Sequence, residues 1–276
     1  MATKYYSGKR VYVTGGSSGI GLEIARQLAP LGADLALFAR NAKKLEEARA
    51  EVKRSGGKGR VEIMPLDVSD NVAVMKIIDR AVREFGVPDI IINSAGIGSA
   101  NYFENISYDE FDRVMKINLY GTRNVIAAAL PYLKERGSGV IVNISSMAGF
   151  SSIFGYTSYA TSKFALVGFS EALRSELVRY GVTVLLACPP ETDTPFLAEE
   201  GKTIPPECRA MKDLMGTLKS DYVARFILRG VARGKYLIMP GYLSRFLYLV
   251  QRFSPGWVSR MVADSTVARA ARKIKN

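Results

Sequence analysis

The chain has 276 residues, of which 48% are hydrophobic and 23% are charged, proportions typical of a folded globular protein. It contains no histidine, which excludes a histidine general base, a Ser-His-Asp or Cys-His nucleophile and a histidine-ligated zinc site. Its two cysteines, Cys188 and Cys208, form no CxxC pair. The sequence therefore predicts neither a disulfide framework nor an iron–sulfur cluster, and it fits a reducing compartment.

The basic residues are concentrated in the last quarter of the chain. The net charge of +12 divides into +1 for residues 1–201 and +11 for residues 202–276. Such a local excess favours an anionic partner, either a lipid surface or a polyanion. The polar start of the chain does not resemble a secretory signal, and no stretch reaches the roughly 18–20 apolar residues of a spanning helix. We expect a cytoplasmic protein, or one peripheral to the cytoplasmic face of a membrane.

Short β-branched segments alternate with longer segments that have apolar residues at helical spacing. The predicted strands are Arg10–Thr14, Asp34–Ala39, Val61–Leu66, Asp89–Ile92, Val140–Ile144 and Val182–Ala187. The predicted helices between them are Ile20–Leu31, Val72–Phe85, Phe111–Leu133 and Phe164–Tyr180. This alternation predicts an α/β fold, a single Rossmann-like, doubly wound parallel sheet with helices on both faces. A last short strand is expected at the sheet edge, at Tyr236–Met239.

The pattern changes after Pro240. An amphipathic stripe at i, i+3, i+4 and i+7 consists of Leu243, Phe246, Leu247 and Val250, and a second stripe begins at Trp257 and ends in Arg269, Arg272, Lys273 and Lys275. We interpret residues 241–276 as a basic amphipathic helical tail that contacts a membrane surface. The alternative is that the tail packs against the body or another subunit.

A glycine-rich segment, TGGSSGIG at residues 14–21, joins the first predicted strand to the first helix. Glycines allow close approach of the backbone to a phosphate, and the N-terminus of the following helix carries free N–H groups and a positive dipole end. The candidate cofactor-binding residues in this loop are Gly15, Ser17, Ser18, Gly19, Ile20 and Gly21.

The second predicted strand ends near the expected position of an adenine ribose. An acidic residue there would bind the 2′-hydroxyl, but the chain has Arg40, with Lys44 shortly after it. These cations favour a 2′-phosphate, and therefore NADPH over NADH. The alternative is that Arg40 is a solvated surface residue at the start of a helix.

Tyr159 and Lys163 form a candidate catalytic pair. Their i, i+4 spacing on a predicted helix places both side chains on one face. A nearby ammonium favours the phenolate and lowers the pKa of a tyrosine from its reference value of about 10, so we expect Tyr159 to act as a proton donor and acceptor. Tyr156 has Ala160 at its own i+4 position and lacks such a partner.

Because of these residues, the chain resembles the short-chain dehydrogenase/reductase family over about residues 8–240. Four motifs match in order: residues 14–21, Asn93-Ser94-Ala95-Gly96, a serine before the tyrosine, and Tyr159-x-x-x-Lys163. The family's serine lies thirteen residues before the tyrosine, which selects Ser146 rather than Ser145. The resemblance implies that residues 1–240 form an NADP-binding reductase domain with the catalytic set Ser146, Tyr159, Lys163 and Asn118.

The resemblance also implies a mechanism and a cofactor site. Ser146 would hydrogen-bond a substrate carbonyl, Tyr159 would give a proton to the developing alkoxide, and Lys163 would bind the nicotinamide ribose and link through water to Asn118. NADPH would lie across the carboxyl ends of the strands, and no metal is expected. Beyond the glycine-rich loop, Arg40 and Lys44, the implied cofactor-binding residues are Asp67, Val68, Asn93, Ala95, Gly96, Tyr159, Lys163, Pro189, Thr192 and Thr194.

The substrate class is indicated by residues 189–195, which read PPETDTP where the family usually has Pro-Gly. This run is similar to that of the 3-ketodihydrosphingosine (3-ketosphinganine) reductases, which implies NADPH-dependent reduction of the C3 ketone of a long-chain 2-amino-3-ketone. Glu191 and Asp193 are candidates to pair with the substrate's ammonium, the alternative being a carboxylate that caps the next helix. We expect residues 190–218 to form a substrate loop whose apolar members are Phe196, Leu197, Ile204, Met211, Leu214 and Met215.

Other functions remain open. The chain could reduce another hydrophobic carbonyl, such as a long-chain 3-oxoacyl thioester, a steroid or a retinoid, or it could be a non-enzymatic NADPH-binding sensor. No nucleic-acid partner is expected, since the basic residues alternate with aliphatic and aromatic ones and no nucleic-acid module is recognised. By resemblance, a homodimer or homotetramer is expected, formed through the helices at Phe111–Leu133 and Phe164–Tyr180.

Overall fold

The computed structural model describes residues 2–213 and 216–254 and, beyond these, positions 257, 261, 264–265 and 267–269. A seven-stranded sheet has the order β3-β2-β1-β4-β5-β6-β9, and every neighbouring pair is parallel. Its strands are β1 (Arg10–Thr14), β2 (Asp34–Ala39), β3 (Val61–Pro65), β4 (Ile90–Asn93), β5 (Gly139–Ile144), β6 (Val182–Ala187) and β9 (Leu237–Ile238). The predicted doubly wound parallel sheet is confirmed, with the last strand at its edge.

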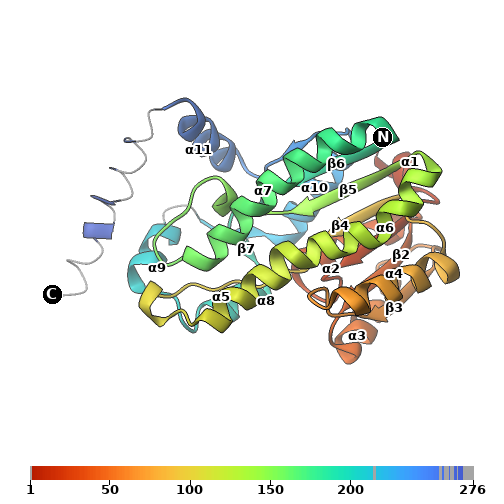
Figure 1. Ribbon diagram of the computed structural model, residues 1–276, viewed down its shortest axis with the longest axis horizontal. Helices are drawn as coiled ribbons and strands as arrows, with labels where there is room; N and C mark the ends of the chain where they lie inside the picture. Colours follow the sequence, from red (N-terminus) through yellow and green to blue (C-terminus); the bar gives the residue numbers. More distant parts are fainter. Residues whose placement is uncertain are drawn as a thin grey trace.

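Helices cover both faces of this sheet (Figure 1). Alternate residues of β1 face opposite sides: Val11 and Val13 pack in one buried cluster and Tyr12 in the other. The first cluster is closed by α2 (Gly19–Leu28), α3 (Ala42–Arg54) and α10 (Ser220–Ala232), and the second by α4 (Asn71–Phe85), α6 (Thr122–Arg136) and the end of α7 (Thr157–Leu177). This alternation with a period of two produces a sheet that is buried on both sides.

Two of the predicted helices differ from the observed ones in a way that affects the site. The segment expected as one helix at Phe111–Leu133 consists of α5 (Tyr108–Met115), a π-helical turn (Lys116–Gly121) and α6. Such turns are rare and occur frequently at functional sites. Helix α7 begins at Thr157, seven residues before the predicted start, so that Tyr159 and Lys163 both lie in its first two turns.

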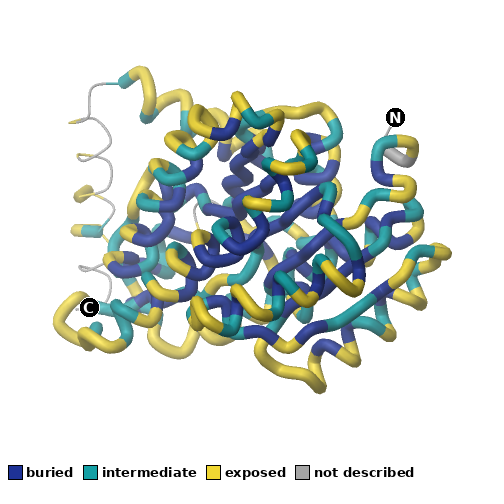
Figure 2. Tube along the Cα trace, turned by 45° about the vertical axis from the view of Figure 1, so that its right-hand side comes forward, coloured by how far each residue is buried: buried dark blue, intermediate teal, exposed yellow. Residues whose placement is uncertain are grey.

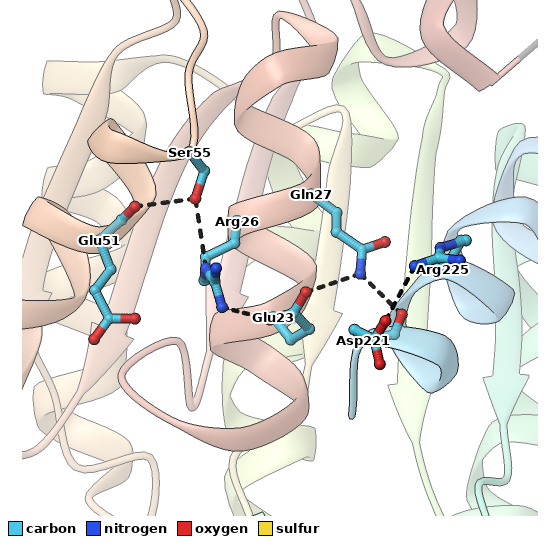
Figure 3. Close-up of polar contacts among 7 residues, drawn as sticks. All are labelled: Glu23, Arg26, Gln27, Glu51, Ser55, Asp221 and Arg225. Atoms are coloured by element: carbon cyan, nitrogen blue, oxygen red, sulfur yellow. Dashed lines mark hydrogen bonds and ion pairs between the residues drawn. The ribbon is translucent and has the colours of Figure 1, made fainter. Parts of the chain in front are cut away.

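A polar network fixes α2, whose N-terminus follows the glycine-rich loop (Figure 3). Gln27 donates from Nε2 to the backbone oxygen of Asp221 at the start of α10 (2.9 Å) and to Glu23 (2.9 Å). Arg26 pairs with Glu23 (3.0 Å) and reaches Ser55 after α3 (3.5 Å). These contacts join the three helices on one face of the sheet.

The remaining elements are a small second sheet with two short helices and, elsewhere in the molecule, an N-terminal helix. A two-stranded parallel sheet is formed by β7 (Thr192–Asp193) and β8 (Leu218–Lys219), and between these strands lie α8 (Pro195–Glu200) and α9 (Pro206–Asp213). A short helix α1 (Ala2–Tyr6) precedes β1. The hydroxyl of Tyr6 donates to the backbone oxygen of Leu228 (2.7 Å), which attaches α1 to α10.

The predicted tail begins with α11 (Tyr242–Phe253), at the upper left of Figure 1. It contacts the body through one face: the Tyr248 ring lies 4.9 Å from that of Phe150, and Arg245 Nε donates to the backbone oxygen of Met239 (3.1 Å). Figure 2 shows burial concentrated in the sheet and its covering helices, whereas α11 is largely exposed. The second predicted stripe lies mostly outside the described residues, and the division of the chain at residue 240 stays a prediction.

Candidate active site

The glycine-rich loop is held by contacts between backbones. Thr14 Oγ1 accepts hydrogen bonds from the N–H groups of Ser94 and Ala95, both at 3.2 Å. Gly15 has a φ of 66°, and a Cβ atom added to it would lie 2.8 Å from the nitrogen of Ala95. A Cβ atom on Gly21 would lie 2.4 Å from the Gly15 oxygen. Only glycine fits at these two positions, which leaves α2 free to present its N-terminal N–H groups to a ligand.

A cavity of 610 Å³ opens beside this loop, at the carboxyl ends of β1, β2 and β4. The sheet order reverses at this point, where doubly wound sheets bind ligands. Arg40 and Lys44 are exposed cations on its wall. The predicted cofactor residues that line the cavity are Gly15, Ser17, Ser18, Arg40, Lys44, Asp67, Val68, Ala95 and Gly96.

Two predicted cofactor residues lie behind the cavity walls. Asn93 is buried at the end of β4 and donates from Nδ2 to Asn143 Oδ1 (2.9 Å), while Asn143 donates to Ser170 (2.9 Å). Gly21 packs against the Gly15 carbonyl. Neither residue is among those that line the cavity. Both therefore support the loops around it through packing and hydrogen bonds.

A second cavity, of 850 Å³, meets the first at Gly15, Ser18, Gly96 and Ile97. The predicted residues that line it include the catalytic Ser146, Tyr159 and Lys163, together with Gly19, Ile20, Pro189, Glu191, Thr192 and Thr194. Asp193 is exposed on β7 and is not among the lining residues. The structure thus brings together residues from the first loop, from β5, from α7 and from the segment after β6.

Three side chains converge in this second cavity. Ser146 follows β5, and its Oγ accepts from the N–H of Ala148 (3.1 Å) while the side chain also bonds with Tyr159. Lys163 lies one helical turn after Tyr159, with its Nζ 5.6 Å from the centroid of the Tyr159 ring. Lys163 Nζ donates to the backbone oxygen of Ile144 (3.1 Å). Two hydroxyl groups and one ammonium therefore face the same space.

The pKa of Tyr159 differs in direction from the sequence-based expectation. Burial raises the pKa of Tyr159 above the ordinary tyrosine value, and the hydrogen bond with Ser146 offsets only part of that increase. The expectation that the Lys163 ammonium lowers the pKa of Tyr159 is therefore wrong for this structure, because desolvation of the phenolate has the larger effect. Burial also lowers the pKa of Lys163 to about 8.

Asn118 lies in the π-helical turn and fixes the wall opposite α7. Its Oδ1 accepts from the N–H of Ile97 (2.8 Å), and its Nδ2 donates to the Ile97 oxygen (2.9 Å) and to Ser162 Oγ (3.0 Å). A Cβ atom on Gly96 would lie 3.2 Å from Asn118 Oδ1 and 3.7 Å from Lys163 Nζ. Asn118 is therefore a neighbour of Lys163 across Gly96. Its link to Lys163 through water stays a prediction.

The predicted substrate loop packs an aromatic residue on Tyr159, the predicted proton donor. The ring of Phe196, at the start of α8, lies 5.8 Å from the ring of Tyr159. A Cβ atom on Gly98 would approach Phe196 to 2.2 Å, so a side chain at this position would force the ring to move. Cys208 on α9 is buried against Tyr156. Phe196, Leu197 and Met211 line the second cavity, and Leu214 and Met215 lie outside the described residues.

Sequence reasoning missed a buried ion cluster on this same loop. Lys212 on α9 contacts the carboxylate of Glu200 on α8, and its Nζ lies 2.5 Å from Glu191 Oε2. It also donates to the hydroxyl of Tyr156 (2.9 Å). Glu200, Glu191, Lys212 and Tyr156 all line the second cavity. The local sequence gives no signal for this cluster, because its members come from four separate segments.

Helix α11 forms the outer wall of the second cavity. Tyr242, Leu243, Ser244, Leu247, Val250 and Gln251 all line it. The part of the chain predicted to contact a membrane is thus also part of the pocket that holds the predicted catalytic side chains. No helix among the described residues has both the length and the apolar character needed to cross a membrane.

Comparison with known proteins places these features in a family context. A profile described as short chain dehydrogenase matches residues 9–205. The chain is 36% identical over 233 residues to 3-dehydrosphinganine reductase of Danio rerio and 39% identical over 232 residues to 3-ketodihydrosphingosine reductase of Bos taurus, each alignment covering 83% of this chain and 70% of the relative. A solved short-chain dehydrogenase from Sphingobium yanoikuyae in complex with NADPH has a TM-score of 0.76 and 28% identity, covering 87% of this chain and 92% of that one.

Proposed function

The chain belongs to the short chain dehydrogenase family of oxidoreductases, and on that premise we propose that it reduces the C3 ketone of 3-ketosphinganine to sphinganine with NADPH. The observation that carries this proposal is the 850 Å³ cavity, in which Ser146, Tyr159 and Lys163 share one space with the apolar wall of α11. A long-chain ketone needs both parts. Relatives from two vertebrates bear the name of this activity.

The 610 Å³ cavity suits a nicotinamide dinucleotide phosphate. Its glycine cradle has no space for a Cβ atom at Gly15, which allows the backbone to contact a pyrophosphate. Arg40 and Lys44 are the cations on its wall, where a 2′-phosphate would be held. When bound there, the cofactor supplies the hydride. The protein's task is to place the nicotinamide beside Tyr159, at the junction of the two cavities.

In the proposed reaction, the hydroxyls of Ser146 and Tyr159 donate hydrogen bonds to the substrate's carbonyl oxygen. Because the pKa of Tyr159 is raised by burial, its proton is retained at neutral pH until negative charge develops on that oxygen. Tyr159 then transfers the proton to the alkoxide, and the Lys163 ammonium beside the ring stabilises the resulting negative charge. Phe196 covers Tyr159 and keeps water from the reacting groups.

The experiment that tests this function follows NADPH oxidation with 3-ketosphinganine in detergent micelles. A long-chain 3-oxoacyl thioester, a steroid ketone and a retinoid aldehyde serve as parallel substrates. We expect turnover of the sphingoid ketone to exceed that of the others by more than about tenfold in kcat/KM. Preferential turnover of another carbonyl would replace the substrate assignment. NADPH binding without any turnover would favour a sensor in place of an enzyme.

We also propose that α11 docks on the cytoplasmic face of a membrane. Phe246, Leu249 and Phe253 follow one another at helical spacing and are 61%, 50% and 82% exposed, which forms an apolar face directed away from the body. Arg252 beside it is exposed and suits anionic headgroups. Since neighbouring residues of the same helix line the cavity, a lipid substrate could enter the site from the bilayer.

Vesicle sedimentation tests this docking surface. We expect the protein to bind vesicles that contain anionic phospholipid, and the double variant Phe246→Ser, Phe253→Ser to bind at least tenfold more weakly. Tyr108→Ser is the matched control, because Tyr108 is 83% exposed on α5, in another part of the chain. Equal vesicle binding by all three proteins would contradict the assignment. Dissociation of an oligomer by the double variant would instead identify α11 as a subunit interface.

For the oligomer, we propose a homodimer or homotetramer that pairs through α5, α6 and α7. Tyr120, in the π-helical turn between α5 and α6, and Phe164 on α7 are 51% and 45% exposed, although both are large and apolar in part. Light scattering coupled to size exclusion measures the mass directly. A monomer at micromolar concentration would overturn this proposal and leave both aromatic residues solvent-exposed.

A further inference from the structure

The ion cluster beneath the substrate loop contains two carboxylates and one ammonium. Glu200 and Lys212 are both 4% exposed as residues, and the Glu191 side chain is 11% exposed. Thr217 donates to the other oxygen of Glu191 (2.7 Å). The formal charges of Glu191, Glu200 and Lys212 sum to −1, while burial raises the pKa of Glu200 and the Arg209 guanidinium opposes that increase. Buried carboxylates are costly unless they are compensated, so a cation that reaches them from the cavity is favoured.

Two carboxylate oxygens of this cluster accept no hydrogen bond from the described residues, Glu191 Oε2 and Glu200 Oε1. Glu191 Oε2 is ion-paired with Lys212. Glu200 Oε1 is buried without such a partner, although the Glu200 carboxylate interacts with Lys212 and with the Tyr156 hydroxyl. Buried polar atoms are almost always hydrogen-bonded in folded proteins. An unpaired carboxylate oxygen on a cavity wall therefore indicates a donor that comes from a ligand, and its charge indicates a cationic donor.

The cluster lies close to the catalytic tyrosine. The Tyr156 hydroxyl accepts from Lys212 (2.9 Å), and the Tyr156 ring lies 5.3 Å from the Tyr159 ring. Glu200 is also one of the charges that raise the pKa of Tyr159. The cluster and the proton donor thus belong to one continuous wall of the same cavity. A substrate whose carbonyl is bound at Tyr159 would place a substituent on the adjacent carbon near this wall.

We propose that Glu200, supported by Glu191 and Lys212, forms a subsite that binds the primary ammonium next to the ketone of an amino-ketone substrate. This inference rests on the proposed function and names the residue that distinguishes an amino ketone from other long-chain ketones. Glu191 was a sequence-based candidate for this role, whereas Asp193 is exposed and outside the cavity lining. Lys212 holds the two carboxylates in place, and the substrate's ammonium completes the charge balance.

The test compares two substrates that differ only in the amine: 3-ketosphinganine and 1-hydroxyoctadecan-3-one. For Glu200→Gln, we expect kcat/KM on the amino ketone to fall about 10- to 100-fold, since a hydrogen bond to a charged group is lost. On the ketone without the amine, we expect a change of less than about threefold. Glu199→Gln is the matched control, because Glu199 lies next to Glu200 on α8 but pairs with Lys202 at the surface. Equal losses on both substrates would overturn the subsite and make the cluster a structural support of the loop.

A second measurement uses the unmodified protein and does not depend on turnover of the sphingoid ketone. Octadecylamine and octadecanol are tested as competitive inhibitors in nonionic micelles, against whichever carbonyl substrate the enzyme reduces. We expect octadecylamine to inhibit at least tenfold more strongly than octadecanol. The basic tail would repel an ammonium, so this preference would come from inside the cavity. Equal inhibition would contradict the subsite. Failure of 3-ketosphinganine as a substrate would overturn the proposed function while leaving this amine comparison valid.

Discussion

The two cavities are built in different ways. Around the first, the shape is set by backbone: Gly15 and Gly21 contact neighbouring main-chain atoms so closely that a side chain is excluded. Around the second, the shape is set by side chains, with Phe196 on Tyr159 and Lys212 between two carboxylates. The glycine contacts come from one short motif, but the rest of the first cavity is lined by four other segments of the chain. The second cavity is lined mainly by side chains of segments distant in the sequence.

Removal of the Tyr159 hydroxyl, which lines the second cavity, should have the largest effect, because that group is the proposed proton donor. We expect Tyr159→Phe to lower kcat by about 10²- to 10⁴-fold, the usual contribution of a positioned general acid. The ring contacts with Tyr156 and Phe196 would remain, so NADPH affinity and thermal stability should stay unchanged. Tyr120→Phe, at an exposed position, is the control. A loss of less than tenfold would mean that another group donates the proton.

A variant of Arg40 tests whether the first cavity binds the 2′-phosphate of NADPH. We expect Arg40→Ala to raise the KM for NADPH about 10- to 100-fold, since one charged partner of a 2′-phosphate is lost. The KM for NADH should change less than about threefold. Lys43→Ala is the matched control, because Lys43 is exposed nearby but does not line the cavity. Equal changes in the KM for NADPH and for NADH would show that Arg40 does not bind the 2′-phosphate.

The glycine cradle is tested by adding one methyl group. Gly21→Ala forces a Cβ atom to within 2.4 Å of the Gly15 oxygen, and we expect the free energy of unfolding to fall by about 1–3 kcal/mol, as for other overpacked sites. Gly168→Ala on α7 is the opposite case, with nothing within 4 Å of the new atom, and should stabilise the protein by about 0.5–1 kcal/mol. Urea unfolding measures both. Equal stability of the two variants would contradict the conclusion that close backbone contacts exclude a side chain at Gly21.

The pH profile tests the electrostatics of the second cavity. Burial lowers the pKa of Lys163 to about 8, so its ammonium is present below pH 8 and is lost as the pH rises through that value. Tyr159 keeps its proton over this range because burial raises its pKa. We therefore expect kcat/KM for reduction to fall by up to about tenfold between pH 8 and 9. In Lys163→Arg the cation persists, so the slower reaction should lose this decline. A flat profile for the unmodified enzyme up to pH 9.5 would contradict this role.

The fold and the centre of the site were predictable because their signals are local. All seven strands of the main sheet coincide with predicted segments to within one residue at either end. The six longer segments are β-branched, since a strand buried on both faces needs such side chains. Tyr159 and Lys163 share a helix, and the glycine-rich loop is continuous in sequence. The breaks in the predicted helices were less visible: the π-helical turn that holds Asn118 follows no signal in the periodicity.

What the sequence determined by itself was the doubly wound sheet, its family and the candidate catalytic set, because each depends on periodicity or on residues close together in the chain. What only the tertiary structure decided was how far each side chain is removed from water and which distant groups it meets. Burial reversed the expected pKa shift of Tyr159 and placed Asn93 behind the cavity wall. Long-range packing joined Glu200 to Lys212 and made α11 a wall of the cavity. Desolvation and contact between distant segments are properties of the folded chain, and no local pattern records them.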